Sequence, residues 1–480
     1  MAVTNRSGAD GSGVAFGKQK AYGTPVVDRG PTPVVSNDPV MIPVIFPVSA
    51  IGIDGDADVV ESNLITAYGS AGPQEIGQEW VDGGWTTRIL PEYIHHMLEG
   101  ILNPITAASV ALNNGVATAQ QTGNANGALT ITNNHHLGDT NGSPTPVGWP
   151  SKLQLTLTGS ATFSDAKMVI VGKRRGGRRV NAPGTDDRLA QFYQIETVPI
   201  TSNTTLSTKF WDQVDSVTVS GVTGASNYKL DYVPDGYKTT IQFQATDPRF
   251  PGWTVLALKG GIPNRATDYV PSEMSVTASS SGIDVAMSGI GTRYDEFRTI
   301  SSLAGYYDPK YALESADDTY YSNPPLNSFP GWAGALLFGD EVVKYTTITF
   351  GVNRNYVPDE GIDGRKFKYG VSASDNRLVT FSPTSYLRAG DATDVFPKFQ
   401  ELFRNDARYP LTMRNLSYDG DGRQKRMDWT CASSQITAYP RSESTGPGNI
   451  ERPLEFQALP GTGNVPELII EIYTETALYT

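Results

Sequence analysis

The chain has 480 residues, a formal net charge of −12 and a pI near 4.9. At roughly 150 residues per domain, this length predicts about three domains. A hydrophobic content of 39% excludes wholesale disorder, and the acidic balance argues against a nucleic-acid-binding surface over the whole molecule. Frequent Gly (49) and Pro (32), with only 18% charged residues, favour short strands and many turns over helix bundles.

The N-terminal region and the single cysteine indicate the compartment in which the protein is made. Residues 1–35 are rich in Gly, Ser and Pro without a sustained period, which predicts a flexible arm. They contain no apolar segment typical of a secretory signal, and the apolar segment 40–48 is too short to span a bilayer. Cys431 cannot form an internal disulfide, and its strand-like context predicts a small buried hydrophobic residue rather than a nucleophile. We expect a soluble protein that is intracellular at synthesis.

The first ordered region combines strands with one helix. Structure is expected to begin near Val40, with a polar loop at 52–58. An apolar stripe of helical spacing then follows: Leu90, Ile94, Met97, Leu98 and Ile101. Pro91 suits the first turn of this helix and Asn103–Pro104 a stop. From about 112 to 148 the Asn, Gly, Thr and Gln content predicts a long exposed linker or loops.

A compact β-module is predicted next. Leu153, Leu155 and Leu157 alternate with polar residues, and Gly159 is expected to be a turn. Further strands are expected at 168–172 and 195–200, and a last one that carries Phe210, Val214, Val217 and Val219 and ends at Ser220–Gly221. Short strands at regular spacing with turn signals between them indicate a small sandwich.

The remaining chain is also dominated by strands. They are expected at 240–245, 254–258, 274–278 and 283–287 (a hairpin), 342–350, 367–371, 378–381, 411–416, 427–432, 454–458 and 468–473. Residues 300–330 are expected to be a connector. A second helix is predicted by Val395, Phe396, Phe399, Leu402 and Phe403, with Asp394 as its N-cap. The last third therefore repeats the first in pattern, though not in residue identity.

The four histidines form two adjacent pairs. Neighbouring helix residues point about 100° apart, so His95 and His96 cannot readily face one ion, and both are expected on the helix flank. His135 and His136 lie in an Asn-rich segment near Asp139, where a solvated turn is favoured over chelation.

Two acidic segments partly match known loop patterns. Asp54–Asp58 resembles the opening of a calcium loop, but the sixth position is Val59 instead of Gly and the twelfth is Ile65 instead of Glu. An acidic turn is the better interpretation. Asp419–Gly422 is a hairpin turn signal.

No motif selects a catalytic centre. The sequence has no Gly-x-Ser-x-Gly elbow, no Walker loop and no histidine placed for an obvious triad, and nothing singles out a carboxylate pair among 50 acids. We therefore expect no catalytic, cofactor-binding or metal-binding residues. The one concentrated basic patch, Lys173–Arg179, could bind phosphate or an acidic surface. Without interleaved aromatics it is not expected to stack on bases, and a solvated hairpin tip touching an acidic copy of the same protein is favoured.

Several segments, in their shared order, resemble the tail tube proteins of long-tailed, siphovirus-type bacteriophages. They are 15–25 (with Tyr22-Gly23-Thr24-Pro25), 258–264 with 271–276, 329–332, 344–350 with 353–356, and 455–458 with 468–473. Segments 157–159, 206–211 and 217–221 resemble the immunoglobulin-like modules displayed on phage structural proteins.

The resemblance implies a mainly β fold: two tail-tube-type β-sandwich/barrel units, each with one amphipathic helix, plus an inserted immunoglobulin-like β-sandwich. The implied domains are a flexible arm (1–35), a first tube domain (36–112 plus 238–310), the inserted domain on the outer surface (113–237) and a second tube domain (325–480).

The implied function is structural and not enzymatic. Subunits would form stacked rings whose sheets join into a barrel, and the arm and loops such as 350–366 would reach the adjacent ring. Viral DNA would pass through the acidic lumen without specific binding. A trimer with pseudo-sixfold symmetry is favoured over a hexamer. The implied partners are other copies of the chain and the tape measure, tail terminator and tail tip proteins, in a virion assembled in the host cytoplasm.

Two other classes remain open. A different virion component, such as a decoration or baseplate protein, would stay a small oligomer. A carbohydrate-binding or hydrolytic β-protein would need aromatic platforms and carboxylates in a cleft.

Overall fold

The computed structural model describes a large part of the chain, and all structural statements below refer to that part. The described residues are 13–19, 46–61, 74–102, 105–112, 115–123, 125–131, 149–174, 192–243, 252–259, 262–296, 329, 334–338, 341–343, 345–359, 370–373, 377–387, 403–405, 408–418, 421–438, 450–461 and 465–478.

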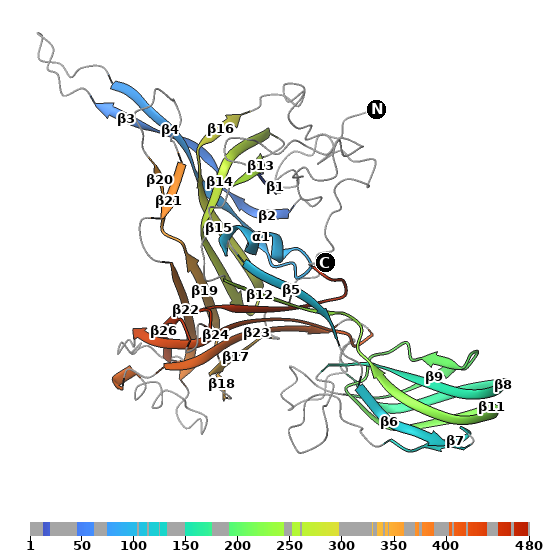
Figure 1. The fold of residues 1–480 in the computed structure, drawn as a ribbon. Coiled ribbons are helices and arrows are strands. Elements are labelled where there is room, and N and C mark those ends of the chain that lie inside the picture. Colours follow the sequence, from blue (N-terminus) through green and yellow to red (C-terminus); the bar gives the residue numbers. More distant parts are fainter. Residues whose placement is uncertain are drawn as a thin grey trace, which may run out of the picture.

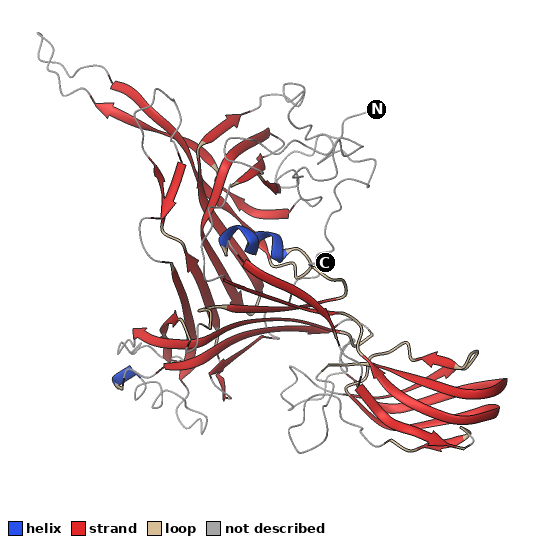
Figure 2. Cartoon of the chain, in the orientation of Figure 1, coloured by secondary structure: helices blue, strands red, loops and turns tan. Residues whose placement is uncertain are grey.

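The fold is mainly β, as the sequence predicts, and the strand pairings are antiparallel (Figures 1 and 2). The strands of the main sheet up to residue 296 are β1 (Gly13–Lys18), β2 (Phe46–Ile51), β3 (Asp54–Glu61), β4 (Gln74–Arg88), β5 (Ile105–Ala111), β12 (Tyr237–Phe243), β13 (Trp253–Lys259), β14 (Ile262–Ser279), β15 (Gly282–Gly291) and β16 (Arg293–Glu296). The later ones are β17 (Gly334–Phe338), β18 (Glu341–Val343), β19 (Thr347–Asn353), β22 (Leu378–Leu387), β23 (Arg408–Tyr418), β24 (Gln424–Ala438), β25 (Ile450–Pro453), β26 (Glu455–Leu459) and β27 (Ile469–Thr474). A separate two-stranded sheet pairs β20 (Tyr356–Asp359) with β21 (Gly370–Ala373).

Six strands of the main sheet form a closed circuit. β1 pairs with β2, β2 with β4, β4 with β15, β15 with β14, β14 with β13 and β13 again with β1. Aromatic rings fill the space that these strands surround: Phe16 stacks on Trp253 with ring centroids 4.3 Å apart, and Trp85 lies 6.0 Å from Phe16. Closing the circuit leaves these strands fewer free edges.

The sheet continues from this circuit into the later part of the chain. The second half of β14 pairs with β19 on the side opposite β15, and β19 pairs with β22. From β22 the pairing passes through β26 to β24, and β24 pairs with both β23 and β27. β27 pairs with β12 and β12 with β5, so strands of the second expected tube domain lie between two groups of strands of the first in one curled sheet (Figure 1). The division of this body into two tube units stays a prediction.

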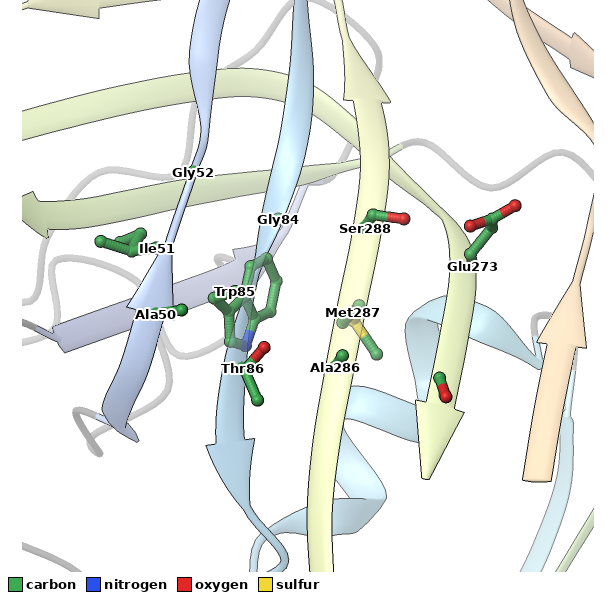
Figure 3. A pocket seen from close by; sticks show the side chains of 11 residues that line it. Ala50, Ile51, Gly52, Gly84, Trp85, Thr86, Glu273, Ala286, Met287 and Ser288 are labelled. Carbon is green, nitrogen blue, oxygen red and sulfur yellow. The ribbon is translucent and has the colours of Figure 1, made fainter. Parts of the chain in front are cut away.

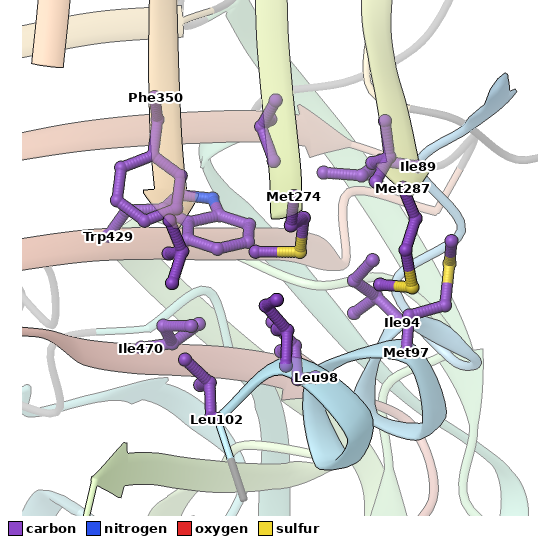
Figure 4. Packing of buried hydrophobic residues seen from close by; sticks show 14 of the residues in the cluster. Ile89, Ile94, Met97, Leu98, Leu102, Met274, Met287, Phe350, Trp429 and Ile470 are labelled. Atoms are coloured by element: carbon purple, nitrogen blue, oxygen red, sulfur yellow. The ribbon is translucent and has the colours of Figure 1, made fainter. Parts of the chain in front are cut away.

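The helix α1 (Ile94–Ile101) confirms the predicted apolar stripe. All five residues of the stripe are buried in the main core, where they meet side chains from strands far along the chain (Figure 4). Leu98 and Leu102 point toward Ile470 and Trp429, and Met97 lies near Met287. The helix starts at Ile94, after a turn at 91–93, and residues 103–104 lie outside the described part.

The inserted module is a separate set of strands with its own hydrophobic core. Its strands are β6 (Gly115–Thr122), β7 (Gly127–Leu129), β8 (Lys152–Arg174), β9 (Phe192–Pro199), β10 (Thr204–Leu206) and β11 (Gln213–Val233). β8 and β11 form one long hairpin-like pair; β6 and β10 flank one half of it and β7 and β9 the other. Its resemblance to an immunoglobulin fold stays a prediction.

Two turns expected in this module are not turns. Gly159 and Gly221 lie inside β8 and β11, with φ of +103° and +77° and irregular pairing nearby. A Cβ on Gly221 would lie 2.3 Å from the carbonyl oxygen of Ser164, so glycine here permits a bend and a close backbone approach within a continuous strand.

Several other segments differ from the sequence expectation. Residues 13–18 of the expected flexible arm form the buried strand β1, because Phe16 and its neighbours complete the closed circuit. The loop expected at 52–58 includes most of β3, which gains its partner in β4. The linker expected at 112–148 contains β6 and β7, which pair with β11. The single strand expected at 342–350 is two strands, β18 and β19.

Some expectations fall outside the described residues. These are the second helix apart from Phe403, the connector 300–330 apart from Phe329, His135, His136 and Asp139, and most of the arm.

Candidate functional site

The candidate site is one face of the main sheet, and it follows from strict alternation along five neighbouring strands. On β14, Met274, Val276 and Ala278 point into the core. Their partners on β15 and β19 do the same, including Val285 and Phe350. Because successive strand residues point to opposite faces, the residues between them form the other, open face.

We call this open face the hydroxyl face, since most of its side chains are Ser or Thr. It comprises Thr86 and Arg88 of β4, Asp284, Ala286 and Ser288 of β15, Glu273, Ser275, Thr277 and Ser279 of β14, Thr347, Thr349, Gly351 and Asn353 of β19, and Leu378, Thr380, Ser382 and Thr384 of β22. One row runs across the five strands and consists of Thr86, Ala286, Ser275, Gly351 and Thr380. At the usual spacing of neighbouring strands the face is roughly 20 Å across.

Charge on the hydroxyl face is sparse and mostly paired. Arg88 Nε lies 3.4 Å from Asp284 Oδ1, and Arg88 Nη1 also donates to the carbonyl oxygen of Ser281 at 3.1 Å. Asn353 Nδ2 donates to Glu273 Oε1 at 2.7 Å. With one basic and two acidic side chains, the face has a formal charge of −1 and carries no lysine and no aromatic side chain.

A shallow hollow of about 270 Å³ lies at the β2 side of this face (Figure 3). It is lined by Ala50, Ile51, Gly52, Gly84, Trp85, Thr86, Glu273, Ser275, Ala286, Met287 and Ser288. Small residues form it because the backbones approach closely: a Cβ on Gly84 would lie 1.8 Å from the carbonyl oxygen of Met287. Beneath it, Tyr269 donates from its hydroxyl to the carbonyl oxygen of Gly83 at 2.7 Å, and burial raises the pKa of Tyr269 well above its ordinary value. This phenol therefore stays a neutral donor.

The histidine pair on α1 is placed differently from the expectation. His95 is buried instead of lying on the helix flank, and its ring lies 3.8 Å from the ring of His96. Burial, helped by the neighbouring imidazole, lowers the pKa of His95 to about 3, and burial lowers the pKa of His96 to about 4. Both rings are therefore neutral near pH 7.

The cysteine, the basic patch and the acidic segments noted in the sequence do not form a binding site among the described residues. Cys431 is buried, as expected for a small hydrophobic residue, and burial raises the pKa of its thiol. Of the basic patch, Arg174 is buried and donates to Gln194 Oε1, which contradicts a solvated tip for that residue, and 175–179 lie outside the described part. Asp54–Asp58 belongs to β3, so the expected acidic turn is wrong. The expected hairpin at 419–422 is confirmed, because β23 and β24 pair around it.

The hydroxyl face was not predicted as a site. Its signal was present in the sequence as Ser and Thr alternating with apolar residues at 274–279, 347–353 and 378–384. What the sequence did not give is the long-range pairing of β14 with β19 and β19 with β22, which joins these segments into one surface.

Among the residues described, no cluster of three or more His, Cys, Asp or Glu side chains could hold a metal ion. In the same part of the chain, no helix has the length and apolar character needed to cross a membrane. No protein-family model and no curated protein matches this sequence.

Proposed function

We propose that this chain is a structural subunit that assembles with copies of itself into the hollow tail tube of a long-tailed bacteriophage. The subunits form stacked rings, and the genome passes through the lumen without being bound. Three copies per ring, with pseudo-sixfold symmetry, are favoured over six.

The observation that carries this proposal is the hydroxyl face. A wall along which DNA slides needs short side chains, few cations to bind phosphate and no aromatic rings to stack on bases. Most side chains of this face are short, the longer ones being Leu378, Glu273 and Arg88. The face carries no aromatic ring, and its single arginine is paired with Asp284. Its slight negative charge adds weak repulsion of phosphate.

The lateral edges of the five strands support ring formation. On one side, β3 pairs with β4 alone within the described residues; on the other, β25 pairs with β22 alone. Such edges present unpaired backbone groups, and pairing β25 of one copy with a strand of the next copy in the ring would satisfy them and continue the curled sheet.

The β3–β4 hairpin supports contact between rings. It extends beyond the body of the molecule (Figure 1), and residues 54–61 and 74–82 carry acidic but no basic side chains. Repulsion between like charges disfavours pairing of the hairpins of two free subunits. In an assembled tube, the hairpin can reach a complementary surface in an adjacent ring.

The alternatives have less support. A carbohydrate-binding protein stacks sugars on exposed aromatic rings, and the hydroxyl face has none. A decoration or baseplate protein stays compatible with a mainly β fold, but nothing in its function calls for a broad face of short hydroxyl side chains.

The test is electron microscopy of the purified, concentrated protein. Hollow rods with a regular ring repeat support the proposal, and the number of protomers in each ring decides between trimer and hexamer. Monomers that bind oligosaccharides, or small oligomers that bind capsid shells, would overturn it.

Two proline variants on β25 sharpen this test. Successive strand residues direct their N–H groups to opposite sides, so one of Glu451→Pro and Arg452→Pro removes an outward donor and the other removes a bond to β22. The variant whose unfolding midpoint is unchanged is expected to lose rod formation.

A further inference from the structure

The inserted module contacts the main body at a small junction beside its two chain connections. The junction consists of the turn before β24 (Asp421–Arg423), the end of β27, and module residues near 150 and 210. The module and the body have separate hydrophobic cores, so this junction decides the direction in which the module projects (Figure 1).

The first part of the junction holds Lys209 and Phe210 of the module. The backbone N–H of Phe210 donates to the carbonyl oxygen of Asp421 at 2.9 Å, and Lys209 Nζ pairs with the Asp421 carboxylate. The Phe210 ring is buried, with Lys152 Nζ 5.0 Å and the Arg423 guanidinium 5.2 Å from its centroid. A buried aromatic ring with two cations this close to its centroid gains cation–π attraction.

The second part centres on Arg423. Its Nη2 lies 2.7 Å from Asp235 Oδ2 and its Nη1 2.6 Å from Glu475 Oε2. The same Asp235 oxygen lies 3.8 Å from Lys152 Nζ of the module. Asp235 therefore links the module, the connection into β12 and the turn before β24.

The third part is a stack of aromatic rings and a cation. Trp149, just before β8, lies 3.9 Å from the ring of Tyr473, and the Arg426 guanidinium lies 5.1 Å from Trp149 and 5.3 Å from Tyr473. Arg426 is held in place by Asp428, to which its Nε donates at 2.8 Å.

Between these contacts the chain bends at Gly236. Its φ is +132°, and a Cβ there would lie 2.6 Å from the carbonyl oxygen of Thr474. The carbonyl oxygen of Gly236 accepts from the N–H of Leu112, so both connections of the module pass this point together.

We propose that the turn Asp421–Arg423 is a latch that fixes the inserted module in one direction, and that releasing it lets the module swing about Gly236. Single exposed ion pairs stabilise little, but here Asp421, Arg423 and Asp235 act together around a buried Phe210. Opening the junction exposes that ring and separates the Arg423 guanidinium from Asp235. This inference concerns the single chain and does not depend on the tube function.

The test measures the distance between module and body in the unassembled full-length chain. Spin labels are placed at Ser216→Cys on the module and Thr437→Cys on the body, both exposed sites, while buried Cys431 stays unlabelled. Double electron–electron resonance is expected to give one narrow distance distribution. In Asp421→Ala/Arg423→Gln the width is expected to be at least about twice as large.

Matched controls separate the latch from general destabilisation. Asp284→Asn removes an ion pair of the main sheet and should leave the distribution narrow, while Lys209→Gln opens the latch from the module side and should broaden it. A latch variant with the narrow distribution of the unmodified chain would overturn the inference. So would a broad distribution in the unmodified chain.

Discussion

Arg354 Nη1 donates a hydrogen bond to the carbonyl oxygen of Ile101 at 3.3 Å, joining positions 253 residues apart in the sequence. Ile101 is the last residue of α1, so the guanidinium satisfies a carbonyl that has no partner within the helix and lies at the negative end of the helix dipole. Arg354 is buried, and its Nη2 also donates to the Tyr356 hydroxyl at 2.6 Å. One side chain thus connects α1 to the segment between β19 and β20.

Removing this side chain is expected to weaken the fold. Arg354→Ala should lower the free energy of unfolding by about 2–3 kcal/mol, because it leaves buried hydrogen-bonding groups without their charged donor. Arg354→Lys should recover part of the loss, since one ammonium cannot reproduce the geometry of the planar guanidinium. Chemical denaturation measures both, and Arg404→Ala at an exposed site is the matched control. Equal midpoints for Arg354→Ala and Arg404→Ala would contradict this role.

Two glycines beside the hollow provide a matched pair. Gly84→Ala places a Cβ 1.8 Å from a backbone oxygen of β15 and should destabilise the protein by more than about 3 kcal/mol or prevent soluble expression. Gly52→Ala meets no atom within 4 Å and should be nearly neutral. Soluble yield and thermal unfolding compare the two. Similar stability of both variants would show that β4 and β15 do not pair in this register.

The buried histidines predict acid sensitivity. Their lowered pKa values mean that, as the pH falls below 6.5, the unfolded chain binds protons that the folded chain does not. Stability should therefore decline from about pH 6.5 and continue to fall to about pH 3. Between pH 7 and pH 5 the expected loss is on the order of 1–2 kcal/mol per histidine. Urea unfolding at pH 7 and pH 5 measures this loss of stability. His95→Leu should make the loss smaller. An equal loss in the variant would show that other titrating groups cause it.

Adding a positive charge to the hydroxyl face tests the proposed lumen. Ser275→Lys and Thr349→Lys each add a cation where the facing residues across the strands are uncharged. If rods form, a short labelled DNA duplex should sediment with these variant rods and be released by salt, because phosphate contacts exchange with counterions. Unmodified rods and rods of Thr437→Lys, an exposed site elsewhere, should retain little. Equal retention by all three kinds of rod would place the hydroxyl face away from the lumen.

The sequence predicted those strands that alternate strictly and lie with one face in a core. The hairpin of β14 and β15 and the strand β27 are examples, since their apolar residues repeat every second position. β1 and β6 were missed, because their short, Gly- and Ala-rich segments become strands only through partners distant in the chain. The sequence wrongly predicts turns at Gly159 and Gly221, because a positive-φ glycine looks the same in sequence whether it ends a strand or bends one.

The candidate site was harder to predict from the sequence than the strands were. Alternating Ser and Thr identify one exposed side of each strand, but not which strands are neighbours. Joining β4, β15, β14, β19 and β22 requires pairings between residues far apart, such as Ser275 with Gly351. The contact of Arg354 with Ile101 depends on the same tertiary arrangement.

The position of β27 has a consequence for synthesis. This strand is the last of the described strands along the chain, yet it lies between β24 and β12 and bridges early and late parts of the sheet. Until β27 has been translated, the edge of β12 that faces away from β5 stays unpaired. The continuous sheet, and with it any surface that spans both halves, can form only once translation has passed residue 474. A chain that stalls earlier keeps unpaired edges on β12 and β24, so synthesis of β27 is the step that allows the two parts of the sheet to join.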